Sequence, residues 1–279
     1  MTHYGLPDGY VQIAFSGGRT SAFLLHQILD ANGDLPERCV VSFQNTGREM
    51  PETLDFVAEV GHRWGVHVVW LEYRPDAPFF EVVGHNSASR DGEPFEALIK
   101  KRKYLPNQQA RFCTAELKVR TAKRYLVSLK WDRWSNIIGI RSDEPQRLNK
   151  PKPKDRWIDL MPLAAAGVTR RVVADFWTKQ PFDLALPNVG GNCWLGNCDG
   201  CFLKSEANIA AFTRDFPDRA AWWERMEDDV TGLTKTAASA QFSKRYSRKE
   251  MRTYMDRQGD LALSGTADFC QAREGECMA

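Results

Sequence analysis

The chain has 279 residues, of which 43% are hydrophobic and 27% are charged, a composition that excludes an intrinsically disordered chain and allows a large buried core. The formal net charge is only +2, so a polyanionic partner would have to bind a local basic patch. No apolar run approaches the length of a membrane span and the N-terminal segment lacks a signal-peptide core, so we expect a cytoplasmic protein without membrane contacts. Cysteine occurs 7 times, which in such a protein favours metal or redox chemistry over disulfides.

A strand, a glycine-rich turn and a helix are predicted near the start of the chain. Residues 11–15 form an apolar run typical of a buried strand, and residues 22–29 have the spacing of an amphipathic helix. Glycines between them allow the backbone to approach a ligand closely, and the N–H groups at a helix start bind phosphate. A plain strand–helix connection is the alternative. We predict that the turn binds phosphate through Ser16, Gly17, Gly18, Arg19, Thr20 and Ser21.

Further short strands, predicted at residues 39–43, 66–71 and 136–140, alternate with amphipathic helices. This alternation favours an α/β fold with a parallel sheet covered by helices on both faces. Ligands of such sheets bind at the carboxyl ends of the strands, and polar clusters lie at these ends here. We therefore expect that a nucleotide whose phosphates bind the turn would also contact Phe43, Asn45, Thr46, Gly47, Gly139 and Arg141.

Charged residues after the strand at 136–140 suggest a catalytic role. Carboxylates beside phosphates usually hold Mg²⁺, and Asp143 and Glu144 are the candidates. Arg19, Arg141 and Lys118 are predicted to stabilise negative charge in the transition state. A solvated turn is the alternative explanation of this cluster.

A cysteine-rich loop is the second informative stretch. Cys198 and Cys201 form a C-x-x-C pair, and Cys193 lies five residues before Cys198. Three thiols on so short a loop favour metal ligation over hydrophobic packing. Cys113 is the best candidate for a fourth ligand, and four thiolates suit zinc or an iron–sulfur cluster. Cys270 and Cys277, near the C-terminus, belong either to a frayed tail or to a sulfur-carrying one.

Basic clusters occur at residues 100–103, 147–156 and 244–249. They are either solvated helix faces or a surface that binds nucleic acid such as DNA or tRNA. Residues 75–94 lack periodicity and are predicted to form a flap. The region after residue 160 is predicted to be mostly helical, with Trp222 and Trp223 in packing between helices.

Four motifs resemble those of the phosphoadenosine phosphosulfate (PAPS) reductase family, which belongs to the PP-loop ATP pyrophosphatases. They are Ser-Gly-Gly-Arg-Thr-Ser at 16–21, Asn-Thr-Gly-Arg-Glu at 45–49, Arg-Phe-Cys-Thr at 111–114 and Gly-Ile-Arg-Ser-Asp-Glu at 139–144. The resemblance implies a PP-loop nucleotide-binding domain over residues 1–160 and a helical region over 161–279 that carries the cysteine loop. It favours a [4Fe-4S] cluster on Cys113, Cys193, Cys198 and Cys201, with zinc as runner-up.

Within the superfamily, the chain is most similar to iron–sulfur DNA phosphorothioation proteins of the DndC/SspD type and to phage-borne relatives. This implies an adenylating ATP pyrophosphatase of sulfur transfer that uses ATP and Mg²⁺. A cysteine desulfurase or another sulfur donor is then an expected partner, and a homo-oligomer is compatible with the pattern. Such chemistry requires the phosphate turn and the cysteine loop to face one shared cavity.

Two alternatives remain from the sequence. The first is a sulfonucleotide reductase, in which Cys277 would attack sulfur. Family members carry the nucleophile in a Glu-Cys-Gly-x-x-His tail, whereas Met278 and Ala279 follow Cys277 here. The second is a non-enzymatic subunit that binds a nucleotide or nucleic acid and has a structural metal site.

Overall fold

The computed structural model describes residues 3–148, 156–189, 192–234 and 240–258. Cys270, Cys277 and most of the basic stretch 147–156 lie outside these ranges. Within them, one sheet of six strands has the order β4-β3-β2-β1-β5-β6. Neighbouring strands run parallel except for β3 and β4. The strands are β1 Tyr10–Ala14, β2 Cys39–Asn45, β3 Val68–Tyr73, β4 Phe80–Val83, β5 Trp134–Ile137 and β6 Trp157–Leu160.

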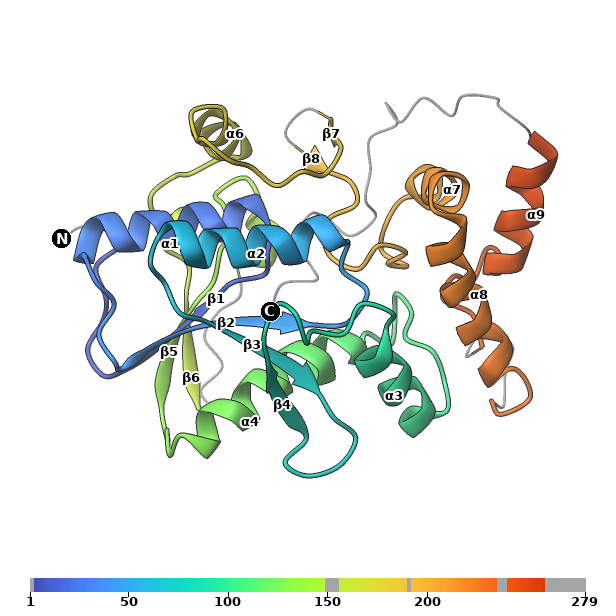
Figure 1. Cartoon of the computed structure of the whole chain (residues 1–279), viewed down its shortest axis with the longest axis horizontal. Coiled ribbons are helices and arrows are strands. Elements are labelled where there is room, and N and C mark those ends of the chain that lie inside the picture. Colours follow the sequence, from blue (N-terminus) through green and yellow to red (C-terminus); the bar gives the residue numbers. More distant parts are fainter. Residues whose placement is uncertain (1–2, 149–155, 190–191, 235–239, 259–279) are drawn as a thin grey trace.

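Helices cover both faces of this sheet, which confirms the predicted α/β class (Figure 1). The first face carries α1 Arg19–Asn32 and α2 Pro51–Arg63, and α6 Arg170–Trp177 packs against α1. The second face carries the π-helix Thr114–Arg120 and α4 Thr121–Ser128. The other elements before residue 200 are α3 Glu93–Arg102, the 3₁₀ turn Pro145–Arg147, α5 Pro162–Ala165 and the paired strands β7 Asn188–Val189 and β8 Asn192–Cys193.

Local sequence signals explain where the first helices begin and end. Proline at the first position of α2 is preorganised for a helix and gives up an N–H that the helix would leave unpaired. Gly33 ends α1 with a φ of 73°, and its N–H donates to the Leu29 carbonyl at 2.7 Å. At its other end α1 begins at Arg19, directly after Gly17 and Gly18 of the glycine-rich turn.

The two faces of the sheet differ in chemistry. Val11 and Ile13 of β1 are fully buried and belong to the main hydrophobic core with α1 and α2. Gln12, which lies between them and therefore points to the opposite face, is also buried. The first face is thus an apolar core, whereas the second carries buried polar groups.

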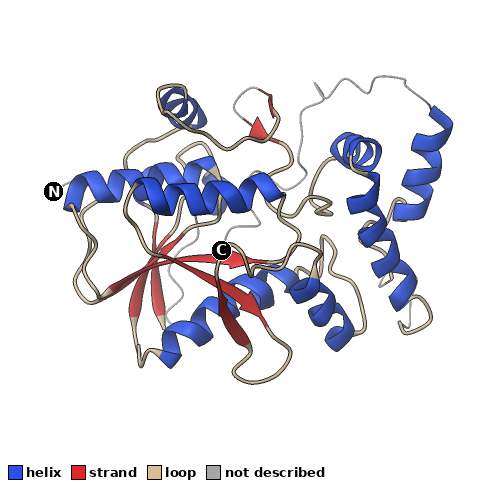
Figure 2. Ribbon diagram, viewed as in Figure 1, coloured by secondary structure: helices blue, strands red, loops and turns tan. Residues whose placement is uncertain are grey.

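Three helices form the C-terminal part of the described chain: α7 Glu206–Asp215, α8 Pro217–Val230 and α9 Arg248–Gln258 (Figure 2). Trp222 and Trp223 of α8 pack against Phe95 of α3, which confirms their predicted packing role. The main core extends from β1 through Trp177 to these helices without a break. The division at residue 160 stays a prediction.

The predicted flap at residues 75–94 is wrong in part, because β4 lies within it. This strand pairs with β3 at the sheet edge and leaves Glu81 and Val82 exposed. An edge strand needs no continuous apolar pattern, which is why periodicity did not reveal it. No helix in the described ranges is long and apolar enough to cross a membrane.

Candidate functional site

The turn between β1 and α1 has the geometry of a phosphate-binding loop. Gly17 has a φ of 77°, and Gly18 is the extended residue that precedes the helix. The Ser21 hydroxyl accepts a hydrogen bond from the Ser16 N–H at 3.2 Å and donates one to the Gly18 carbonyl at 2.9 Å. The turn therefore has a fixed shape, and the N–H groups of the first helical turn remain available to an anion.

Replacing Gly17 with alanine should destabilise the protein by about 1–3 kcal/mol and weaken phosphate binding. An added Cβ would lie 2.8 Å from Thr53 Cγ2 and 3.0 Å from Val57 Cγ2, in a backbone conformation that L residues avoid. Gly65→Ala is the control, because Gly65 has a φ of 63° and no atom within 4 Å of an added Cβ. Thermal unfolding measures both variants, and equal melting temperatures would contradict tight packing beneath the turn.

A cavity of about 140 Å³ lies over this turn. All six residues of the turn line it, together with Gly139 and Arg141 from the segment after β5. Cys193, Gly196 and Asn197 of the cysteine loop line the same cavity. The predicted meeting of the turn and the cysteine loop is therefore confirmed for Cys193. Glu144, named above as a candidate Mg²⁺ ligand, also lines the cavity, whereas sequence reasoning missed the remaining lining residues, which are Thr53, Arg147, Arg170 and Leu184.

Arginines surround the cavity, and the carboxylates next to them hold them in place. Arg141 donates from Nε to Asp143 at 2.8 Å and from Nη1 to the Thr20 hydroxyl at 3.2 Å. Glu144 accepts from the Arg141 N–H at 3.0 Å and from Arg147 at 2.8 Å. Asp143 and Glu144 therefore hold the side chains of Arg141 and Arg147 in position in this structure. A bound Mg²⁺ stays a prediction.

The charge state of Asp143 suits this role. Burial raises the pKa of its carboxyl, but hydrogen bonds from the Arg170 N–H and from Arg141 outweigh this effect, and the net pKa is lowered. The carboxylate is thus ionised at neutral pH. The contribution of this carboxylate to the stability of the folded protein is lost as the pH falls through its lowered pKa.

Arg19 is held by a partner that the sequence did not reveal. Its Nε donates to Asp183 Oδ1 at 2.7 Å, and its Nη2 contacts Asp183 Oδ2. The Trp177 indole N–H donates to the Arg19 carbonyl at 3.0 Å. Arg19 lines the cavity while its guanidinium is paired at one side, so an arriving phosphate would compete with Asp183 for it.

Comparison with known proteins identifies the family of this fold and cavity. Residues 10–164, more than half of the chain, match the phosphoadenosine phosphosulfate reductase domain. The chain belongs to this family. It is also 30% identical over 212 residues to the nin region protein ORF290 of Escherichia phage lambda, a match that covers 73% of this chain and 69% of that protein. The crystal structure of PAPS reductase from Candida auris in a phosphate complex aligns with 66% of this chain and 81% of its own, at 18% identity and a TM-score of 0.41.

The matched residues 10–164 include the turn, Arg141 and Arg147, whereas Arg170 and the cysteine loop lie beyond them. The match to the domain over residues 10–164 and the similarity to the phage lambda protein support the family-level resemblance drawn from the four motifs. The finer resemblance to DNA phosphorothioation proteins stays a prediction.

The residues expected at the end of β2 are buried within the protein and do not line the cavity over the turn. Phe43 lies beneath Gly17 and meets Trp70 edge to face at 4.9 Å between ring centroids. Asn45 donates to Glu72 at 2.6 Å, and Thr46 donates to Glu49 at 2.8 Å. These buried side chains stabilise the segment next to the turn from inside the protein. Gly47, with a φ of 79°, lies against Gly92.

The four predicted metal ligands are all free thiols, which suits an iron–sulfur cluster or zinc. Among the described residues, however, no three His, Cys, Asp or Glu side chains form a group that could hold a metal ion. Cys193 lines the cavity, whereas the Cys198 sulfur lies 3.3 Å from the Thr46 hydroxyl in the interior. Burial raises the pKa of the Cys193 thiol, although Arg19 lowers it in part, so Cys193 is protonated at neutral pH. The present arrangement does not fit a cluster.

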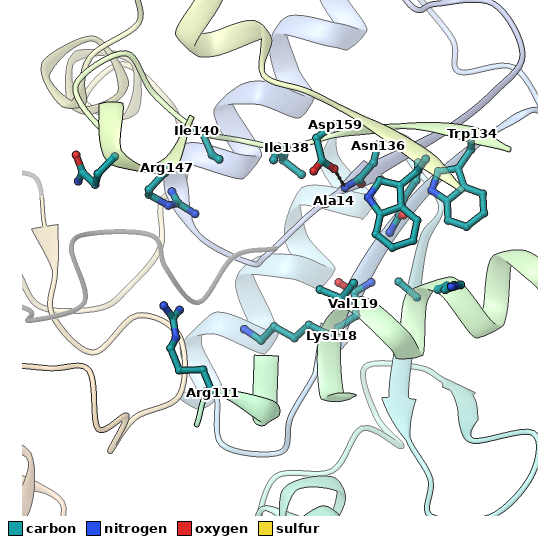
Figure 3. A pocket seen from close by; sticks show the side chains of 16 residues that line it. Ala14, Arg111, Lys118, Val119, Trp134, Asn136, Ile138, Ile140, Arg147 and Asp159 are labelled. Carbon is teal, nitrogen blue, oxygen red and sulfur yellow. Dashed lines mark hydrogen bonds between the residues drawn. The ribbon is translucent and has the colours of Figure 1, made fainter. Parts of the chain in front are cut away.

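Lys118, predicted to act at the phosphates, lies elsewhere. It lines a second cavity on the other face of the sheet together with Arg111 (Figure 3). Glu116 forms ion pairs with Arg102, Arg120 and Arg124, and its single negative charge offsets only part of the basic charge near Lys118. Nucleic-acid binding by the basic clusters stays a prediction.

Proposed function

We propose that this protein is an adenylating ATP pyrophosphatase of sulfur transfer, which binds the phosphates of ATP on residues 16–21. The observation that carries the proposal is the single cavity that the glycine-rich turn shares with Arg141, Arg147, Arg170 and Cys193. Backbone N–H groups and arginines on one side suit a polyphosphate. A thiol on the other side suits sulfur chemistry. The family match over residues 10–164 agrees with a nucleotide substrate.

In the proposed reaction, an oxygen of the acceptor attacks the α-phosphorus of ATP. The bond to the β-phosphate oxygen breaks, pyrophosphate leaves, and the acceptor carries AMP on that oxygen. Hydrosulfide released by the sulfur donor then attacks the acceptor atom that carries this oxygen. The bond between that atom and the oxygen breaks, and AMP leaves with the oxygen, because AMP is a far better leaving group than the bare oxygen. Arg141, fixed by Asp143 and within 3.2 Å of Thr20, is placed to stabilise charge on the phosphates. Mg²⁺ would neutralise further charge on them.

The acceptor is proposed to be DNA or tRNA, and the donor a cysteine desulfurase or another sulfur carrier. A [4Fe-4S] cluster on Cys113, Cys193, Cys198 and Cys201 would require the cysteine loop to rearrange, so no step is assigned to it. We expect anaerobically purified protein to be brown, with about four iron per chain. Cys198→Ser should lose that iron and Cys39→Ser should keep it. One zinc per chain would identify the runner-up, and a metal-free protein would contradict both.

A second candidate, reduction of PAPS, follows from the family match itself. One assay separates the two functions: the protein is incubated with ATP, Mg²⁺, hydrosulfide and DNA or tRNA, or with PAPS, thioredoxin, thioredoxin reductase and NADPH. We expect AMP and pyrophosphate from ATP, with none from Gly18→Asp, which controls for contaminating enzymes. Sulfite from PAPS would support the reductase instead. No turnover of either compound, with ATP binding intact, would support a non-enzymatic subunit.

A further inference from the structure

A second cavity in the described part of the chain is distinct from the cavity over the phosphate turn. It measures about 310 Å³ and lies between the second face of the sheet and the helices Thr114–Arg120 and α4. Arg147 is the only residue that it shares with the cavity over the turn. Its volume is in the range of sites that hold small organic ligands. We call it the sheet-face cavity.

A row of polar side chains crosses the floor of this cavity. Gln12 of β1 pairs in register with Asn136 of β5, which pairs with Asp159 of β6. Strands of parallel sheets covered on both faces are normally apolar, because a buried polar group costs free energy unless it is hydrogen bonded. Asn136 donates to Asp159 at 2.7 Å and Gln12 donates to Ser42 at 3.0 Å. Folding alone does not require polar side chains at these three positions.

Two buried polar atoms along the cavity have no hydrogen-bond partner in the described structure: Asn136 Oδ1 and Trp134 Nε1. Asn136 is 9% exposed and Trp134 is 5% exposed. A buried polar atom without a partner costs free energy, and a ligand that pairs with these two atoms regains it. One atom accepts and the other donates, which is the pairing that a heterocyclic base offers along its edge.

Aromatic groups lie at one end of the cavity and most of its cationic groups lie at the other, although Lys123 Nζ lies 5.8 Å from the centroid of the Trp157 ring. Trp134 pairs in register with Trp157, and the two indoles stack at 5.4 Å with 18° between their planes. On the other side of Asn136 and Asp159, Arg111, Lys118 and Arg147 lie around the opposite end (Figure 3). An aromatic end suits a flat base and a cationic end suits a phosphate.

We propose that the sheet-face cavity binds a mononucleotide, with its base against Trp134, Trp157 and Asn136 and its phosphate towards Arg111 and Lys118. This is a second site, separate from the ATP bound on residues 16–21. A single nucleotide fits better than a nucleic-acid strand, because Trp134 and Asn136, two of the three residues that would contact the base, are more than nine-tenths buried. Arg147 borders both cavities, so it contacts whichever phosphates occupy them.

The test is equilibrium dialysis with radiolabelled AMP. The Gly18→Asp variant, which disables the turn, should still bind about one AMP per chain. Adding Asn136→Leu, which keeps the shape but removes the acceptor, should weaken that binding at least about tenfold. Ser135→Ala, on the same strand but the opposite face, is the control and should bind as Gly18→Asp does.

Three results would overturn the proposal. The first is no AMP binding to Gly18→Asp, and the second is equal affinity with and without Asn136→Leu. The third is displacement of AMP by a ten-nucleotide single-stranded DNA, which would assign the cavity to nucleic acid. If Asn136→Leu fails to fold by circular dichroism, Trp157→Leu replaces it, since the half-buried Trp157 can be shortened at less cost. It should weaken AMP binding by a similar factor, because stacking on an aromatic ring contributes about 1–3 kcal/mol per base.

Discussion

Replacing Gly18 with aspartate should leave the protein folded and weaken ATP binding at least about a hundredfold. Gly18 has an ordinary extended backbone, and Ser16 Oγ, at 3.7 Å, is the only atom near an added Cβ. A larger side chain therefore fits. Its carboxylate would lie among the N–H groups at the start of α1, where we place the phosphates. Two like charges about 4 Å apart repel by about 4 kcal/mol at an effective dielectric constant near 20.

Gly18→Ala is the matched control, because it adds the same Cβ without the charge. It should bind ATP within about threefold of the unaltered protein, whereas Gly18→Asp should not bind at micromolar concentrations. Isothermal titration calorimetry measures both, and melting temperatures report the fold. If Gly18→Asp bound ATP as well as Gly18→Ala, phosphate recognition would lie outside the turn.

Replacing Asp199 with alanine should lower the free energy of unfolding by about 3–5 kcal/mol. Asp199 is fully buried and accepts hydrogen bonds from Arg48 at 2.7 Å, Arg219 at 2.6 Å and the Trp223 indole at 2.8 Å. The Arg48 side chain is only 3% exposed, so the variant leaves a buried cation without its carboxylate. A loss of this size lowers the melting temperature by roughly 10 °C.

The substitution of Asp199 should also affect the cysteine loop of the candidate functional site. Its N–H donates to the Arg48 carbonyl at 2.8 Å, and Cys198 forms a β-bridge with Glu49, so this cluster fixes the cysteine loop against the end of β2. Urea unfolding measures the change. Asp132→Ala is the control, since the Asp132 side chain is 86% exposed in its ion pair with Arg156, and it should change stability by less than about 1 kcal/mol. Equal effects of the two substitutions would contradict a structural role for the cluster.

Local patterns predicted the parts of the site that depend on neighbours in sequence. The turn at residues 16–21 was visible because a strand, two glycines and a helix follow one another. The position of Arg141 near the turn followed from parallel topology, since β1 and β5 are adjacent and end at the same edge. The cysteine loop was visible from its spacing, although only Cys193 of its thiols lines the cavity.

Contacts between distant segments could not be predicted in this way. Asp183 lies 164 residues from the arginine that it holds, and no periodicity links them. Asp143 and Glu144 have the residue types of Mg²⁺ ligands, but carboxylates bind arginine equally well, and only the geometry separates the two roles. Lys118 was assigned to the phosphates from its motif, whereas the helix Thr114–Arg120 directs it to the opposite face of the sheet.

The most direct test of the central claim is a crystal structure of the protein with α,β-methylene-ATP, which cannot release pyrophosphate. We predict phosphate density within hydrogen-bond distance of the backbone N–H groups of residues 17–21, with Arg141 against it and Cys193 facing it across the cavity. Phosphates found away from this turn, for example only between Arg111 and Lys118, would contradict the claim.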